Sequence, residues 1–354
     1  MNRCNISKRE MTIFFVVTFG LTILMGIVMG IIYTEHPVDY FVLLQMYYPD
    51  MGAILALMSD KERRKDLPIK FFGTYLFFSI TSVLYLILQV VILNRDLTKH
   101  MGYWMIIGSI TLILIYTYES DEKISNYGLK LSENGKDSFR YTILFIILYI
   151  FRLATTLYIL GSERIDIIAP LIDPVVLFKT ILLPLNFFIA IMPFLGEELG
   201  WRYFLQPILQ KKMGKRKGVI LLGFIWGIWH LPVNLFYHSP KLSLYPVLNQ
   251  LIVCISYSVF LGLVYMKTEN VWAVSLIHYI NNNLGSIIYN ETEVVDYVFN
   301  WKSFLLNSIC FSLIYLSFLL SKNIMRIRFL PLPRNIRFPE IRFKSVYYKW
   351  CKFN

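Results

Sequence analysis

The sequence predicts an all-α membrane protein, a bundle of about eight to ten transmembrane helices that encloses a polar intramembrane site. Hydrophobic residues make up 56% of the 354 residues and charged residues only 16%. The apolar residues fall in long blocks rather than in amphipathic stripes, which is typical of membrane spans. A few acids and histidines interrupt these blocks, and such residues usually face a polar interior and mark function.

Ten segments approach the length of about 17–25 residues that a helix needs to cross a bilayer. In chain order they are residues 11–33, 40–58, 71–94, 101–118, 140–160, 174–206, 219–236, 245–266, 270–290 and 303–321. Segment 40–58 contains Pro49-Asp50 and segment 101–118 is short, so either can be a tilted or re-entrant piece. The first segment lacks a small-residue cleavage site, which favours a retained span over a signal peptide.

We divide the chain into three parts: N-terminal transmembrane helices over 1–173, a catalytic transmembrane core over 174–321, and a basic aromatic tail over 322–354. With ten spans, the Lys/Arg clusters near residues 3–9, 61–65, 123–140 and 211–217 and in the tail all fall on one side. Basic loops stay in the cytoplasm, so we expect a multi-pass plasma-membrane protein with both termini cytoplasmic.

The tail accounts for most of the positive charge. Residues 322–354 carry nine basic side chains and one acidic, a net charge of +8 out of +12 for the whole chain. Phe, Tyr and Trp are interleaved with these charges, a composition that binds anionic lipid headgroups when it follows a membrane span. We therefore expect the tail to lie on the bilayer surface and not on nucleic acid.

Three charged residues lie within six consecutive positions of the apolar segment 174–206, namely Glu197, Glu198 and Arg202. A charge at that depth costs about 2.5–3.5 kcal/mol on insertion scales, so each needs a partner or a function. Glu198 and Arg202 are four residues apart on one helix face and can neutralise each other. Glu197 is rotated by about 100° from Glu198 and stays available for chemistry.

Two of the five histidines, His230 and His278, also lie within apolar segments. Trp226 precedes His230 by four residues and Asn282 follows His278 by four, so each pair shares a helix face. Counted from the basic clusters at about 1.5 Å per residue, Glu197, His230 and His278 reach similar depths in the membrane. The sequence thus predicts that polar groups of three helices converge in one layer.

These residue types suit the hydrolysis of a peptide bond. A carboxylate and a neutral imidazole, here Glu197 and His230, can take a proton from water and make it a nucleophile. A second histidine with an asparagine, here His278 and Asn282, can donate hydrogen bonds to the oxyanion. This chemistry needs no cofactor, although Glu197, His230 and His278 also match a catalytic zinc ligand set.

The pattern Glu-Glu-x-x-x-Arg, aromatic-x-x-x-His and His-x-x-x-Asn resembles the CPBP family of membrane proteins, which includes CAAX prenyl proteases and bacteriocin-processing, Abi-type proteins. The resemblance covers about residues 185–290 and implies an intramembrane endopeptidase, of glutamate type or metal-dependent. It implies that Glu197, His230, His278 and Asn282 are catalytic, and that Glu198, Arg202 and Trp226 support the site. Phe is common where this chain has Trp226. The implied substrate is a membrane-associated leader peptide or a prenylated peptide.

Two alternatives remain. Intramembrane charges also mark transport pathways, and Asp50, Arg152 and Lys179 add three more. However, the two halves of the chain show no inverted repeat. A non-catalytic relative that binds peptides as an immunity or scaffold protein would keep the same fold.

Overall fold

The computed structural model describes residues 6–93, 98–159, 172–238, 244–289 and 301–321, and every element in these ranges is helical. The first group of helices is α1 (Lys8–Ile32), α2 (Asp39–Gln45), α3 (Tyr48–Met58), α4 (Lys61–Lys65), α5 (Ile69–Leu86), α6 (Thr98–Tyr116) and α7 (Asp121–Asn126). The second group is α8 (Gly135–Ile159), α10 (Pro174–Phe187), α11 (Ile191–Glu198), α12 (Gln206–Met213), α13 (Lys215–Trp229), α14 (Leu231–Val233), α15 (Leu244–Thr268), α16 (Val271–Tyr289) and α17 (Trp301–Tyr315). The all-α helix bundle that the sequence predicts is confirmed.

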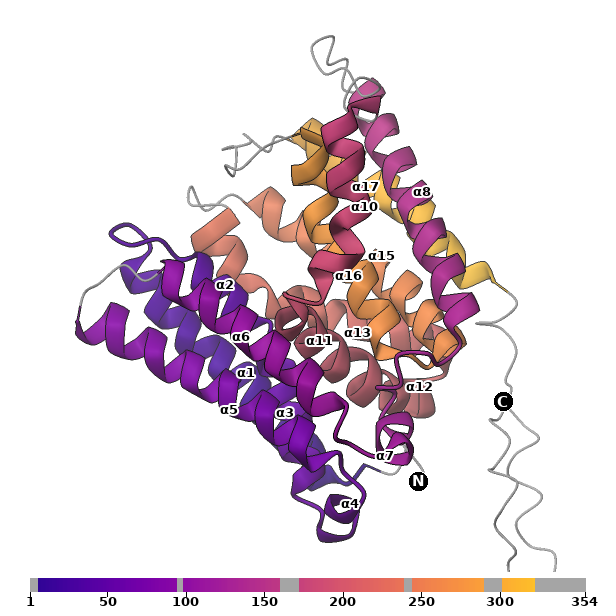
Figure 1. The fold of residues 1–354 in the computed structure, drawn as a ribbon. Helices are drawn as coiled ribbons and strands as arrows, with labels where there is room; N and C mark the ends of the chain where they lie inside the picture. The colour runs from indigo at the N-terminus through magenta and orange to yellow at the C-terminus, as the bar shows by residue number, and fades with distance from the viewer. Residues whose placement is uncertain (1–5, 94–97, 160–171, 239–243, 290–300, 322–354) are drawn as a thin grey trace, which may run out of the picture.

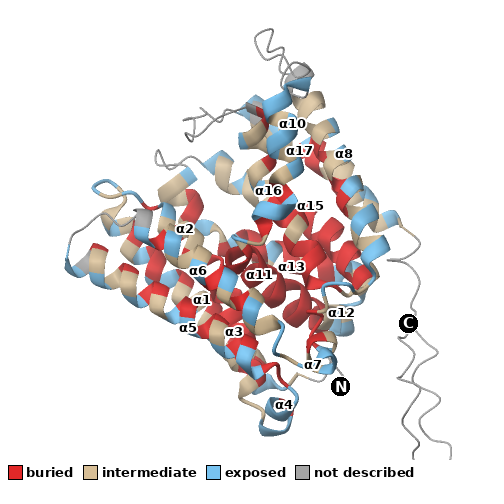
Figure 2. Cartoon of the chain, in the orientation of Figure 1, coloured by how far each residue is buried: buried red, intermediate tan, exposed pale blue. Residues whose placement is uncertain are grey.

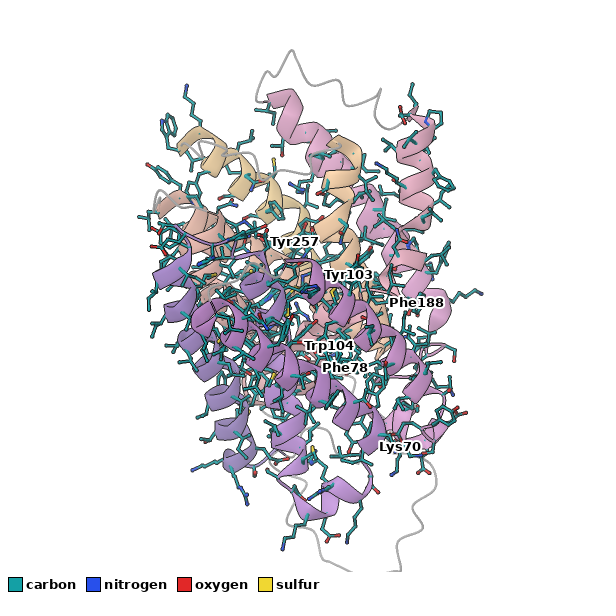
Figure 3. All side chains as sticks on the ribbon, turned by 60° about the vertical axis from the view of Figure 1, so that its left-hand side comes forward. Lys70, Phe78, Tyr103, Trp104, Phe188 and Tyr257 are labelled. Carbon is teal, nitrogen blue, oxygen red and sulfur yellow. The ribbon has the colours of Figure 1, made fainter. Side chains whose placement is uncertain are left out.

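Two helices of the second group, α11 and α13, lie in the centre of the bundle, between the first group and the outer helices of the second. Figure 1 shows α1 to α6 on one side, α8, α10 and α17 on the other, and α11 and α13 between them. Aromatic side chains fasten the first group, as where Phe78 of α5 meets Trp104 of α6 with ring centroids 4.8 Å apart (Figure 3). The most deeply buried residues gather on α11, α13 and α15 (Figure 2), so the predicted polar residues lie in the best-packed part of the molecule.

Glycines allow the central helices to approach closely. A Cβ on Gly200 would lie 2.6 Å from the backbone carbon of Pro49 in α3, and one on Gly223 would lie 2.9 Å from the Cys254 carbonyl oxygen in α15. Side chains at these positions would therefore force the helices apart. The N-terminal helix α3 and the C-terminal helix α15 are thus both held against the segments that carry the glutamates and His230.

Five helices in the described part of the chain are long and apolar enough to cross a membrane, and two bent pairs raise that number to seven. Two further apolar helices, His100–Tyr116 and Phe304–Leu320, are shorter than these candidate spans. The protein is therefore a multi-pass membrane protein. The tail over 322–354, on which the lipid-headgroup prediction rests, lies outside the described residues.

The predicted span over 174–206 is a broken helix in the structure. The structure divides it into α10 and a second helical stretch over Ile191–Met213, with an angle of 66° between them. Pro193 explains the break, because proline has no N–H to donate to the carbonyl of Ile189 and its ring crowds that carbonyl. The predicted span over 219–236 is also bent, by 43°. His230 lies at this bend, just before Leu231-Pro232.

Candidate active site

Glu197 and Glu198 form the last turn of α11, and a π-helical segment, Leu199–Leu205, continues from them. Both carboxylates are buried, with relative exposures of 2% and 0%. π-Helical turns inside α-helices are rare and occur frequently at functional sites. The local backbone is therefore specialised where the sequence places its two adjacent acids.

Glu198 accepts two charge-assisted contacts, one on each oxygen. Its Oε2 lies 2.7 Å from Arg202 Nε, which is the ion pair that the four-residue spacing predicts. Its Oε1 lies 2.9 Å from Nδ1 of His278 on α16. Sequence reasoning missed this second contact, because helical spacing reveals neighbours on one helix and not partners on another. Glu198 thus positions a predicted site histidine as well as an arginine.

Arg202 is completely buried and has partners on three helices. Besides Glu198, its NH1 lies 3.0 Å from Ser258 Oγ on α15, and its guanidinium carbon lies 5.2 Å from the centroid of the Trp226 ring on α13. A cation over an indole face is attracted to the negative face of the ring. No sequence motif marks Ser258, which only the packing of α15 against the glutamate segment reveals.

Glu197 has a partner on a different helix. The indole Nε1–H of Trp226 donates to Glu197 Oε2 over 2.7 Å. Helix geometry predicts only that Glu197 is directed away from Glu198, and the folded protein adds this contact from α13. Because an indole nitrogen can only donate, Glu197 is the acceptor in this contact.

His230 is held by the backbone of the same tryptophan. Its Nδ1 lies 2.9 Å from the carbonyl oxygen of Trp226. A carbonyl can only accept, so Nδ1 carries the proton and the lone pair of the neutral ring is on Nε2. No described residue forms a hydrogen bond with Nε2 of His230. The imidazole is therefore oriented with its basic nitrogen available.

Trp226 joins the separate parts of the site. Its ring centroid lies 5.7 Å from that of His230 and 5.6 Å from that of His278. Its ring nitrogen binds Glu197 and its backbone oxygen binds His230. The predicted contact between Trp226 and His230 is present, and the structure adds that this one residue contacts both histidines and Glu197.

The N-terminal helices also reach the site. The side chain of Gln45 donates from Nε2 to the carbonyl of Trp229 over 2.7 Å. That carbonyl lies at the end of α13, where the bend removes its helical partner, so a side-chain donor is needed there. Gln45 lies in a segment that gave no sequence signal for the site.

Asn282 does not join the cluster in this structure. It is exposed on α16, and its Oδ1 accepts from Nδ2 of Asn281 over 2.9 Å. Asn281 in turn accepts from the Tyr257 hydroxyl over 2.5 Å. The role of Asn282 in stabilising an oxyanion therefore stays a prediction.

The alternative zinc set depends on where its ligand atoms lie. Nδ1 of each histidine contacts an oxygen of the protein and leaves Nε2 free, as in histidines that bind zinc. Within the described ranges, no group of three His, Cys, Asp or Glu side chains is arranged to hold a metal ion. We therefore derive no step through a metal.

The fold and the site together define a multi-pass membrane helix bundle with buried acids and histidines gathered in its interior. Comparison with known proteins makes the class more specific: residues 179–284 match the family model described as "Type II CAAX prenyl endopeptidase Rce1-like". Residues 179–284 are therefore similar to this family of CAAX prenyl endopeptidases, which confirms the family resemblance that the motifs predict. No curated protein and no solved structure gives a significant match.

Proposed function

We propose that the protein is a glutamate-type intramembrane endopeptidase, in which Glu197 and His230 activate the water that attacks a peptide carbonyl. The observation that carries this proposal is the double role of Trp226, which holds Glu197 through its indole and His230 through its backbone. Two side chains that activate one water have to be held in a fixed geometry, because the rate of hydrolysis depends on the position of the attacking oxygen.

In the proposed reaction, the water oxygen bonds to the carbonyl carbon as Glu197 takes one of its protons. Nε2 of His230, which holds a lone pair, accepts the hydrogen bond that orients this water. The carbonyl oxygen becomes an oxyanion. When the tetrahedral intermediate collapses, the C–N bond breaks and the proton on Glu197 passes to the leaving amine.

His278 is the proposed donor to that oxyanion. Its Nδ1 is committed to Glu198, so only Nε2 can face a reacting group. If Glu197 and Glu198 are both ionised, Arg202 balances one of the charges and a doubly protonated His278 balances the other. The Nε2–H of this imidazolium is then a charged donor, which stabilises an oxyanion more than a neutral donor does. Asn282 would supply the second donor from the next turn.

The proposed substrate is a membrane-associated peptide, either prenylated near its C-terminus or a leader peptide of the kind that bacteriocin-processing relatives handle. The matched family is described by its action on prenylated CAAX tails. The test is cleavage by the purified protein, in lipid nanodiscs, of a farnesyl-Cys-Val-Ile-Met peptide and of an unprenylated leader peptide. Glu197→Gln is the inactive reference. If the wild type and Glu197→Gln give the same product profile for both peptides, the proposal is wrong and the fold serves a binding or transport function.

We also propose that the tail over 322–354 binds anionic headgroups on the cytoplasmic face of a plasma membrane. Its net charge of +8 supports this, at about 1 kcal/mol per basic residue near an anionic surface. A peptide of these residues should bind vesicles that contain phosphatidylglycerol and not vesicles of phosphatidylcholine alone. Equal binding to both kinds of vesicle would contradict an electrostatic attachment.

A further inference from the structure

Arg152 is an intramembrane cation that the proposed catalytic cluster does not use. It lies in α8, twelve residues beyond Arg140, and the polar sequence Gly161-Ser162 begins nine residues after it. Among the described residues no carboxylate lies within ion-pair distance of its guanidinium. An arginine inside a bilayer without an anionic partner is costly and points to a function.

The Arg152 side chain points toward the middle of the bundle. Its guanidinium carbon lies 5.0 Å from the ring centroid of Tyr149, one turn back along α8, and 4.5 Å from that of Phe311 on α17. It is therefore directed back along α8, away from the end of this helix at Ile159. A side chain that only needed to reach lipid headgroups would extend to that end.

Hydrogen-bonding groups lie beside the guanidinium. The hydroxyls of Tyr149 and of Tyr315 on α17 are next to it. The Nε of Arg152 and Oγ1 of Thr156, one turn further along α8, are buried with no hydrogen-bond partner among the described residues. Buried polar atoms in native proteins are nearly always paired, so two buried donors without a partner at one cation indicate a ligand that accepts hydrogen bonds. The ligand that fits this chemistry is a small oxyanion such as a carboxylate.

The cluster is connected to the proposed active site through α16. Tyr257, labelled in Figure 3, stacks edge-on against Phe311 with ring centroids 5.2 Å apart. The hydroxyl of Tyr257 donates to Asn281, three residues after His278 on the same helix. The arginine cluster and the catalytic cluster are thus adjacent parts of one polar interior.

The separation of the two clusters can be counted along the helices. The first residues of α8 and α16 are tied together, because Asn134 donates to the Thr268 carbonyl over 2.8 Å and Asn270 donates to the Glu133 carbonyl over 2.9 Å. At about 1.5 Å per residue, His278 lies about 10 Å from these helix starts and the backbone of Arg152 about 26 Å from them. The guanidinium is directed back by about one 5.4 Å turn, so it lies about 20 Å from the helix starts. The remaining distance of about 10 Å between His278 and the guanidinium corresponds to about three residues of extended peptide.

We propose that Arg152 binds the terminal carboxylate of the peptide substrate and so sets how far from the C-terminus the chain is cut. This inference rests on the proposed peptidase function and adds the group by which the substrate is recognised. Arg152 lies outside the matched range 179–284, so the carboxylate site belongs to the part of this chain beyond the family region. The hydroxyls of Thr156 and Tyr315 would complete the site as donors to the same carboxylate.

The test compares two forms of one peptide, farnesyl-Cys-Val-Ile-Met with a free carboxylate and with a C-terminal amide, on the full-length protein in phosphatidylcholine nanodiscs. For the wild type, we expect KM to be about tenfold lower for the acid than for the amide, since a charge-assisted pair is lost in the amide. In Arg152→Met the KM of the acid should rise to that of the amide, with kcat unchanged. Arg152→Lys should keep part of the preference, and Arg140→Met, an exposed arginine of the same helix, should keep all of it.

Binding separates this proposal from the proposed catalysis. The affinities of both peptides are also measured on Glu197→Gln, which cannot cut them. Tighter binding of the acid that disappears in Glu197→Gln/Arg152→Met supports the carboxylate site even if the wild type cleaves neither peptide. If binding and cleavage show no acid preference that depends on Arg152, the proposal is overturned. It is equally overturned if Arg152 only retains added phosphatidylglycerol, because the ligand is then a lipid phosphate.

Discussion

Arg202→Met tests the assignment of Glu198 and Arg202 as the frame of the site. The two side chains are both fully buried and meet over 2.7 Å. Breaking a buried ion pair from one side costs about 3–5 kcal/mol, because the remaining charge is left buried without compensation. Arg202→Met also removes the hydrogen bond to Ser258 and the contact with the Trp226 ring. We therefore expect a loss of at least about 3 kcal/mol in the free energy of unfolding.

The assay is reversible unfolding in mixed micelles, followed by tryptophan fluorescence, of the wild type, Arg202→Met, Glu198→Gln and the double variant. The double variant should be more stable than Arg202→Met alone, because Glu198→Gln removes the uncompensated charge. Arg140→Met is the matched control, since Arg140 is exposed and pairs with Asp137 at 3.6 Å, a contact worth about 0–1 kcal/mol. An Arg202→Met variant as stable as Arg140→Met would refute the framework role.

Three further predictions concern the catalytic and packing residues. His230→Ala should lower kcat by a factor of about 10²–10⁴, which is the usual contribution of a general acid–base group. His36→Ala, in a loop, is the control and should leave kcat unchanged. Both values are measured by peptide cleavage. Gly200→Ala should lower the free energy of unfolding by about 1–3 kcal/mol or more, because its Cβ would lie 2.6 Å from the Pro49 backbone. In the same unfolding assay Gly73→Ala should be tolerated, because its Cβ would meet no atom within 4 Å. Cleavage should survive exhaustive chelation, and an activity that chelation removes and zinc restores would contradict the glutamate mechanism.

The features that could be predicted from the sequence are those that depend on one helix. The four-residue spacing of Glu198 and Arg202 was sufficient to predict their ion pair, and the same spacing related Trp226 to His230. The apolar blocks were sufficient for the all-α membrane fold. In each case the relevant distance is fixed by helix geometry, which is the same wherever the helix lies.

The features that could not be predicted depend on contacts between helices. The indole of Trp226 reaches Glu197, Glu198 reaches His278, and Gln45 reaches the end of α13, over sequence separations that no periodicity encodes. The angle of 66° between α10 and the stretch over Ile191–Met213 also depends on how the two helices pack against their neighbours. Spacing also paired Asn282 with His278, but the structure pairs it with Asn281.

The most direct test of the central claim is the turnover of Glu197→Gln, measured by mass spectrometry on a cleaved peptide in the same nanodiscs. Gln is nearly isosteric with Glu and still accepts from the Trp226 indole through its amide oxygen, so the fold and the contacts of the site should persist. An amide cannot take a proton from water, and we therefore predict that hydrolysis falls to background while peptide binding is retained. A Glu197→Gln variant that cuts at the wild-type rate would show that the water is activated elsewhere.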